Sequence, residues 1–369
     1  METPVDPMHA TGNEPGRYLP SLTGIRALAA LLVLGMHADQ NVPAGVISVL
    51  PFLARGYLGV DFFFVLSGFI ITHVYFSSLV HPSRNAIQVF LWHRLIRLYP
   101  VHVTVLALLV GLVQLARIAE IPLNHPQEWR GSEIVWQLTL LQAWGIAETP
   151  GWNGPSWSIS AEWFAYLLFP LLAPALSHVR ERSAALAIAV AALTATAALF
   201  AWFDWSLNTW VGAPALTRVS GEFLCGAALR RALDIGAKPT GQNGDFLGIT
   251  AFAMFLIGAS AGLPDFALVA LLAVTVFAAA TSAGPLTRIL GSTPLVWLGE
   301  VSYSVYMVHF PVLLVFRRLS ERLGFVGGGT LAFITAVTLV IATAAILFYL
   351  VERPARRRLR DQFGVLAPA

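Results

Sequence analysis

Long apolar runs, separated by short polar stretches, set the pattern of this 369-residue chain. Runs of ~20 residues are long enough to cross ~30 Å of hydrocarbon as helices. The pattern predicts an all-α integral membrane protein, a polytopic bundle of about ten transmembrane helices. We expect these helices at about residues 20–40, 57–80, 99–118, 158–177, 184–203, 217–234, 246–262, 265–282, 294–316 and 327–351.

The two ends of the chain are polar. Residues 1–17 are rich in Pro and Gly and lack the basic and apolar regions of a signal peptide, which predicts a disordered cytoplasmic tail. Residues 355–369 form a basic tail with a run of arginines. Cytoplasmic segments carry an excess of Lys and Arg, and an even number of spans brings both termini to one side. We therefore expect both termini in the cytoplasm.

The composition excludes several classes of protein. Hydrophobic residues make up 57% of the chain and charged residues only 12%, against a norm of roughly 25% charged in soluble domains. The sequence pI is about 9.2, but the basic residues are spread over short loops, which argues against a nucleic-acid partner. A single cysteine, Cys225, excludes an internal disulfide and a cysteine-based zinc cluster. No metal site is expected.

The first apolar run contains Arg26 and, eleven residues later, His37. On a helix this spacing puts both side chains within ~20° of one line and ~16 Å apart along the axis. We expect the cation near the cytoplasmic end and the imidazole in the outer half. The alternative is an arginine that snorkels to the interface and a histidine satisfied between helices.

Two acidic residues interrupt other apolar runs. Asp61 lies in the second run, where an unpaired carboxylate is costly, so it needs Arg26, His37 or another cation and could orient the imidazole. Ser158 and Glu162 are four residues apart and share one face of the fourth helix. The alternative for this segment is a helix cap beneath interfacial tryptophans.

Three further segments carry polar patterns. Arg94 and Arg97, three apart in the expected loop before residue 99, suit a polyphosphate, although arginines are common at the cytoplasmic surface. In the ninth helix Ser302, Tyr306 and His309 form one stripe, which lines either a substrate site or a hydrogen-bonded packing seam. Residues 134–143 are expected to form a re-entrant or surface helix.

Together these segments resemble the acyltransferase-3 family of membrane acyltransferases. Arg26 with His37 is similar to the family's R-x10-H pattern, and Arg94 with Arg97 is similar to its RxxR. The remaining similar blocks are residues 59–69, 155–162 and 302–309 and the sequence Glu352-Arg353-Pro354. The blocks come in family order and run from residue 18 to 354.

The resemblance implies a transmembrane acyltransferase domain over residues 18–354 in a bacterial inner membrane, in contact with membrane lipids. It implies acyl-CoA, acetyl-CoA by default, as co-substrate on the cytoplasmic side, with no bound cofactor. Acceptors are hydroxyls of carbohydrates, cell-envelope polysaccharides, lipids or macrolide-type compounds. Some members add a C-terminal esterase-like domain, and we expect none in this protein. Either this protein suffices alone, or a separate periplasmic partner does that work.

These residues suggest one mechanism. Arg94, Arg97 and Arg26 hold the CoA phosphates, and His37 is the general base on the acceptor hydroxyl, with Asp61 or Glu162 fixing its tautomer. We expect Ser158, Tyr306 and His309 to bind substrate. An acyl-enzyme on His37, a serine or a tyrosine is an alternative.

Two other functions compete with acyl transfer. A proton-coupled transporter predicts inverted repeats, and none is evident. A glycan polymerase or flippase predicts large external loops, and only residues 119–157 are long enough.

Overall fold

The computed structural model describes residues 19–42, 45–123, 126–147, 149–236, 242–322 and 329–363. Within these ranges the chain is helical and contains no strand. The expected tail at residues 1–17 and the last six residues of the C-terminal tail lie outside the described residues. The remainder of that C-terminal tail is helical.

The long helices are α1 (Pro20–Asn41), α3 (Leu58–Leu79), α4 (Arg84–Ile118), α6 (Trp157–Ser177), α7 (Arg182–Trp202), α8 (Ala213–Ile235), α9 (Gln242–Ala261), α10 (Asp265–Thr281), α12 (Thr293–Arg322) and α13 (Gly329–Leu347). A π-helical turn (Phe348–Glu352) joins α13 to α14 (Arg353–Phe363). The short helices are α2 (Val46–Val49), η2 (Pro51–Arg55), η3 (Pro126–Trp129), α5 (Glu133–Thr139), η4 (Gly154–Ser156) and α11 (Pro285–Leu290).

Each predicted apolar run forms a helix. Within the described residues, eight helical segments are long and apolar enough to span a membrane, so the protein is a multi-pass membrane protein. Two expected spans are not among the eight: α10 has only 17 residues, and α8 carries several charged side chains. The full count of ten and the side of the termini stay predictions.

The sequence placed three helix boundaries wrongly. Residues 84–98 were expected as a loop but form the first turns of α4. Likewise α12 continues to Arg322, and the last helix continues through its π turn to Phe363. The cause is the same in each case: polar residues at the edge of hydrocarbon end an apolar run without ending the helix, because backbone hydrogen bonds continue into water.

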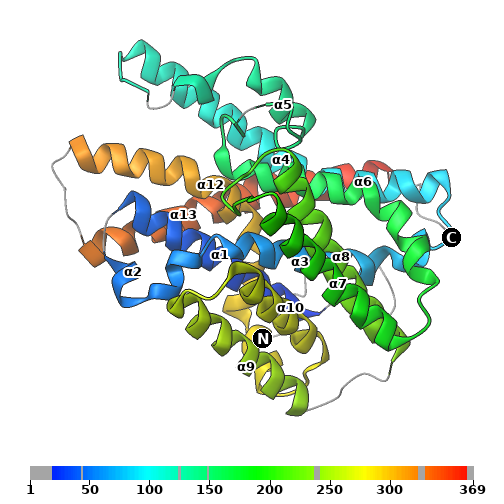
Figure 1. The fold of residues 1–369 in the computed structure, drawn as a ribbon. Helices are drawn as coiled ribbons and strands as arrows, with labels where there is room; N and C mark the ends of the chain where they lie inside the picture. Colours follow the sequence, from blue (N-terminus) through cyan, green and yellow to red (C-terminus); the bar gives the residue numbers. More distant parts are fainter. Residues whose placement is uncertain are drawn as a thin grey trace, which may run out of the picture.

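Helices α1 and α3 lie at the centre of the bundle (Figure 1). α1 packs against α12 and α3, α3 packs against α8, and the outer pairs are α7 with α8, α9 with α10 and α12 with α13. The α3–α8 crossing depends on two glycines. A methyl group on Gly68 would lie 1.9 Å from the carbonyl oxygen of Phe223, and one on Gly226 would lie 1.9 Å from that of Val65. Such close backbone approach is common between membrane helices.

The bundle has two ends. Residues 45–57 and 203–212 lie at one, which we call the loop-rich end. Residues 80–83 and 177–181 lie at the opposite end, where Arg231 of α8 donates to the carbonyl of Val179 at 2.9 Å. Above the bundle in Figure 1, α5 confirms the helix expected at 134–143 as far as Thr139, and residues 140–143 are not helical. It is fastened to α4 by His102, whose Nε2 lies 2.8 Å from the carbonyl oxygen of Gln137.

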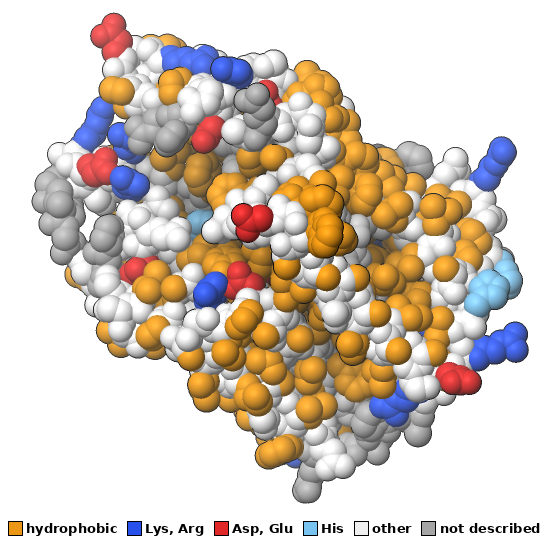
Figure 2. Space-filling model, in the orientation of Figure 1, with side chains coloured by type: hydrophobic (Ala, Val, Ile, Leu, Met, Phe, Trp, Pro, Cys, Tyr) orange, Lys and Arg blue, Asp and Glu red, His pale blue; other side chains and the backbone are white. Residues whose placement is uncertain are grey.

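Apolar side chains cover the middle of the molecule. In Figure 2 the hydrophobic surface lies between charged side chains that gather toward the upper left and the right of the view. The exposed apolar side chains of the whole bundle include those of Leu171, Val190, Ile257, Leu331, Ile346 and Leu350. Such exposure is expected where lipid, not water, surrounds the helices.

Candidate active site

A cavity opens between α1, α3, α4, α6 and α12. It encloses about 790 Å³ including its open part. Its lining residues are Arg26, Val60, Phe63, Phe64, Leu66, Ser67, Ile70, Ile71, Arg94, Arg97, Leu98, Ser158, Ile159, Glu162, Tyr166, Ser302, Tyr303 and Tyr306. Six of the nine predicted site residues are in this set, although they come from four separate helices.

Three guanidinium groups meet in this cavity, those of Arg26, Arg94 and Arg97. Arg94 donates to the Tyr75 hydroxyl at 3.0 Å, and its guanidinium carbon lies 5.0 Å from the centre of that ring. Its buried Nε–H has no hydrogen-bond partner among the described residues. The prediction that Arg94 and Arg97 lie in a surface loop is wrong, because both belong to α4 and point into the bundle.

Arg97 forms an ion pair with Glu352 at the end of the π turn. Glu352 is fully buried and also accepts from the Ser304 hydroxyl at 2.7 Å. The Glu352-Arg353-Pro354 block of the sequence therefore reaches the cavity through one carboxylate. That carboxylate fixes the position of Arg97.

Glu162 lies on the cavity wall and accepts two hydrogen bonds on one oxygen. Ser67 of α3 donates from 2.6 Å and Tyr166 of α6 from 2.5 Å. The predicted shared face of Ser158 and Glu162 is confirmed, because both line the cavity, as Tyr166 also does. Glu162 is the sixth residue of α6, too far inside the helix to be its N-cap.

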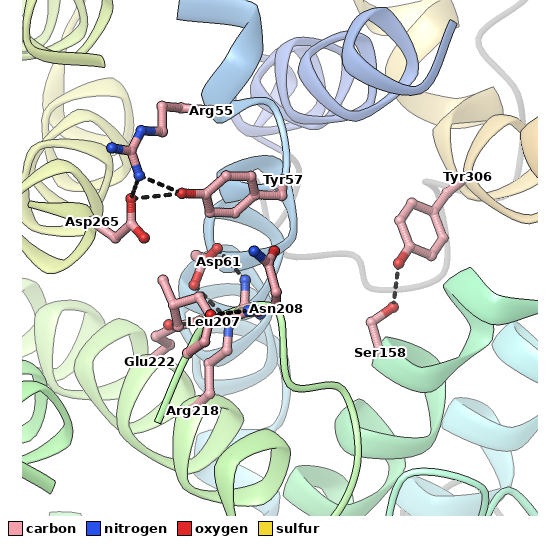
Figure 3. A network of polar contacts seen from close by, with 11 residues as sticks. Arg55, Tyr57, Asp61, Ser158, Leu207, Asn208, Arg218, Glu222, Asp265 and Tyr306 are labelled. Atoms are coloured by element: carbon pink, nitrogen blue, oxygen red, sulfur yellow. Dashed lines mark hydrogen bonds and ion pairs between the residues drawn. The ribbon is translucent and has the colours of Figure 1, made fainter. Parts of the chain in front are cut away.

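Ser158 and Tyr306 join α6 to α12 beside the cavity (Figure 3). The serine hydroxyl donates to the Tyr306 oxygen at 2.8 Å, and the Tyr306 hydroxyl donates to the carbonyl of Pro155, also at 2.8 Å. Further along α12, Pro311 has no N–H for the carbonyl of Met307. The buried Asn153 amide donates to that carbonyl at 3.1 Å.

Two imidazoles lie beyond Tyr306. The centre of the His309 ring is 5.6 Å from that of Tyr306 and 4.9 Å from that of His37. The Nδ1 atom of His37 lies 2.9 Å from the carbonyl oxygen of Val33, and that of His309 lies 2.5 Å from the carbonyl oxygen of Tyr306. A carbonyl only accepts, so both rings carry hydrogen on Nδ1, and in its neutral form each ring has a lone pair on Nε2.

Asp61 forms an ion pair with Arg218, which is not among the predicted site residues. Arg218 of α8 donates to both carboxylate oxygens of Asp61, from Nε at 2.8 Å and from Nη2 at 2.5 Å (Figure 3). The same guanidinium donates to the carbonyl of Leu207 at 2.9 Å and lies 5.1 Å from the centre of the Trp157 ring. Of the three partners considered for Asp61, the third, another cation, is the one observed.

Neither Asp61 nor Glu162 sets the tautomer of His37, contrary to expectation, because the Val33 carbonyl does so. Arg218 was missed, yet the sequence held a signal: it lies four residues before Glu222 in an apolar helix, and Nε of Arg218 is 3.9 Å from that carboxylate. Both side chains are buried.

A second polar cluster at the loop-rich end joins η2 to the start of α10 (Figure 3). Arg55 donates to Asp265 at 2.7 Å and to the Tyr57 hydroxyl at 2.6 Å. Partial burial raises the pKa of the Tyr57 phenol to about 12. This cluster fastens the loop after α1 to the neighbouring helix pair.

Among the described residues, no group of three or more His, Cys, Asp or Glu could hold a metal ion.

Comparison with known proteins identifies the family. A model of the acyltransferase domain of type 3 matches residues 19–351. The chain belongs to the acyltransferase-3 family. It is an acyltransferase for groups other than aminoacyl groups, as the resemblance of its motifs implied. No solved structure matches the chain.

The relatives of this acyltransferase include proteins named as acyltransferases and O-acetyltransferases. It is 32% identical to the acyltransferase MdmB of Streptomyces mycarofaciens, over 92% of each chain. It is 24% identical to the O-acetyltransferase OatA of Staphylococcus aureus and 26% identical to the putative peptidoglycan O-acetyltransferase YrhL of Bacillus subtilis. The match covers 95% and 92% of this chain but only 59% and 55% of those two proteins. These relatives support membrane O-acyltransferase activity.

Proposed function

We propose that this protein moves an acyl group, acetyl by default, from acyl-CoA to a hydroxyl of a carbohydrate, a cell-envelope polysaccharide, a lipid or a macrolide-type acceptor. We place it in the bacterial cytoplasmic membrane. The observation that carries this proposal is the arrangement of the site. Three guanidinium groups and Tyr306 lie on the cavity wall, and the rings of His309 and His37 follow beyond Tyr306, with 5.6 and 4.9 Å between successive ring centres.

The arginines suit the phosphates of the donor. Guanidinium groups bind phosphate through paired, charge-assisted hydrogen bonds. Arg94 has an Nε–H without a partner among the described residues, and Arg26 and Arg97 line the same space. In this scheme CoA enters from the end of the bundle that lies opposite the loop-rich end. Its pantetheine arm then extends from the cavity toward His37, ~16 Å along α1 from Arg26.

His37 suits the role of general base. Its Nδ1–H is held by a backbone carbonyl, so its Nε2 lone pair is the one available to a substrate. The acceptor oxygen attacks the thioester carbonyl while its proton moves to Nε2. The C–S bond then breaks, and the thiolate takes that proton to leave as CoA-SH. A base placed in this way is typically worth roughly 10²–10⁴ in rate.

The acceptor class rests on the relatives. OatA is named an O-acetyltransferase and YrhL a putative peptidoglycan O-acetyltransferase, so hydroxyls of envelope glycans are the first acceptors to test. The 32% identity with MdmB over nearly all of both chains keeps other hydroxyl acceptors in the panel.

Thermal unfolding tests the donor site without an acceptor. The detergent-purified protein is heated with and without acetyl-CoA at about 100 times its dissociation constant, which stabilises the folded state by about 2.7 kcal/mol. We expect the wild type to shift upward and Arg94→Ala/Arg97→Ala not to shift. The control is Arg317→Ala/Arg318→Ala, which removes two arginines that are partly exposed at the end of α12 and should keep the shift.

An equal shift in the wild type and in Arg94→Ala/Arg97→Ala would contradict the assignment of the phosphates to these arginines. No shift in the wild type at any acetyl-CoA concentration would reject acetyl-CoA as the donor.

A further inference from the structure

His309 is a buried histidine whose ring is only partly used. Its Nδ1–H is hydrogen-bonded to the Tyr306 carbonyl, and its side chain is 1% exposed. Its Nε2 has no hydrogen-bond partner among the described residues. A buried polar atom without a partner is destabilising, so such an atom in a native structure calls for an explanation.

The nearest imidazole is that of His37, 4.9 Å away between ring centres and tilted by 51°. In the resting state each ring is fixed with hydrogen on Nδ1, so each Nε2 is an acceptor and neither can donate to the other. Protonation of His37 changes this relation. Its Nε2 becomes a donor, and the lone pair of His309 shares the new N–H with the substrate as a second acceptor, in a three-centre hydrogen bond.

We propose that His309 is a positioning residue whose Nε2 lone pair accepts a hydrogen bond from His37 once His37 has taken the proton of the acceptor hydroxyl. This proposal rests on the proposed function. The hydrogen bond exists only after proton transfer has begun, so it lowers the barrier without tightening substrate binding. When the departing thiolate takes the proton from His37, the bond is lost and His309 returns to its resting state.

Local structure supports this role for His309. Pro311 removes one backbone hydrogen bond from α12, and Asn153 compensates at the Met307 carbonyl. The Tyr306 carbonyl holds the imidazole in one tautomer. The ring is thus held at a point where α12 is braced by a neighbouring segment. A rigid acceptor needs little reorganisation during the reaction.

The test compares two substitutions of His309. His309→Gln keeps a side-chain oxygen that accepts a hydrogen bond, whereas His309→Leu keeps bulk but has no acceptor. Membranes containing each variant receive radiolabelled acetyl-CoA, and both CoA release and label in the non-protein acceptor fraction are measured. We expect His309→Leu to lose roughly 10- to 150-fold in kcat, the equivalent of one hydrogen bond to a charged group. The KM for acetyl-CoA should stay unchanged, and His309→Gln should recover most of the loss.

His102 provides a matched control, because it is equally buried, has one nitrogen on a backbone carbonyl and leaves Nδ1 without a partner in the described part of the chain. His102→Leu and His102→Gln should have equal kcat values. Equal kcat for the two His309 variants, or a change confined to KM, would overturn the role of His309. A wild type that releases no CoA and labels no acceptor would instead reject the proposed function.

Discussion

At the scale of single residues, charged side chains inside the bundle lie next to side chains of opposite charge. Asp61 and Glu222 have no exposed surface, and Arg218 lies between them. Removal of one member of a buried ion pair typically costs about 3–5 kcal/mol, whereas replacement of the whole pair by apolar groups is often neutral or stabilising.

Arg218→Leu should therefore destabilise the protein by about 3–5 kcal/mol, because two buried carboxyl groups lose their cation. Asp61→Leu/Arg218→Leu should be more stable than the single variant, since Glu222 can then remain as a neutral acid. Unfolding temperatures of the purified variants measure the order. If the double variant is the less stable of the two, Asp61 and Arg218 do not contribute to stability as one ion pair.

His37 permits a sharper separation of binding from chemistry. His37→Ala should insert and fold normally and keep its thermal shift with acetyl-CoA, because the arginines that hold the donor are untouched. Acetyl transfer should fall by roughly 10²–10⁴, the usual contribution of a general base. A variant that keeps full transfer activity would remove His37 from the mechanism.

At the scale of helices, close approach at the α3–α8 crossing is a requirement. Gly226→Ala should force the backbones apart at the Val65 carbonyl and destabilise the protein by about 1–3 kcal/mol, the usual cost of overpacking. Gly111 in α4 is the matched control, because nothing lies within 4 Å of an added methyl group there. Gly111→Ala should be neutral or stabilising by up to about 1 kcal/mol. The unfolding temperatures of the two variants are compared. Equal effects would show that the α3–α8 crossing does not require a glycine at residue 226.

The sequence was sufficient for the position of nearly every long helix, because apolar run length is a direct consequence of hydrocarbon thickness. It failed at the start of α4 and the end of α12, where helices continue beyond the apolar run. Local spacing correctly placed Ser158 with Glu162 and Ser302 with Tyr306. It could not find the partner of Asp61, since Arg218 is 157 residues away and only tertiary packing brings the two together.

At the scale of the whole molecule, the two ends of the bundle should face different compartments. The predicted cytoplasmic termini put the loop-rich end outside. In a Cys225→Ala background, a membrane-impermeant thiol reagent applied to intact cells should label Ser48→Cys, which is exposed at the loop-rich end. It should not label Ser183→Cys, which is exposed at the opposite end, until the cells are opened. The reverse pattern would invert the topology.

The charged pair between α3 and α8 also bears on how the chain enters the membrane. A charged residue such as Arg at the centre of an isolated helix costs about 2.5–3.5 kcal/mol during insertion, and α8 fails the apolarity expected of an independent span. Its counter-charge, Asp61, belongs to a helix that is synthesised much earlier. Biogenesis should then require α3 to wait at the insertion site until α8 emerges, so that the two helices pass into lipid as a neutralised pair and not one after the other.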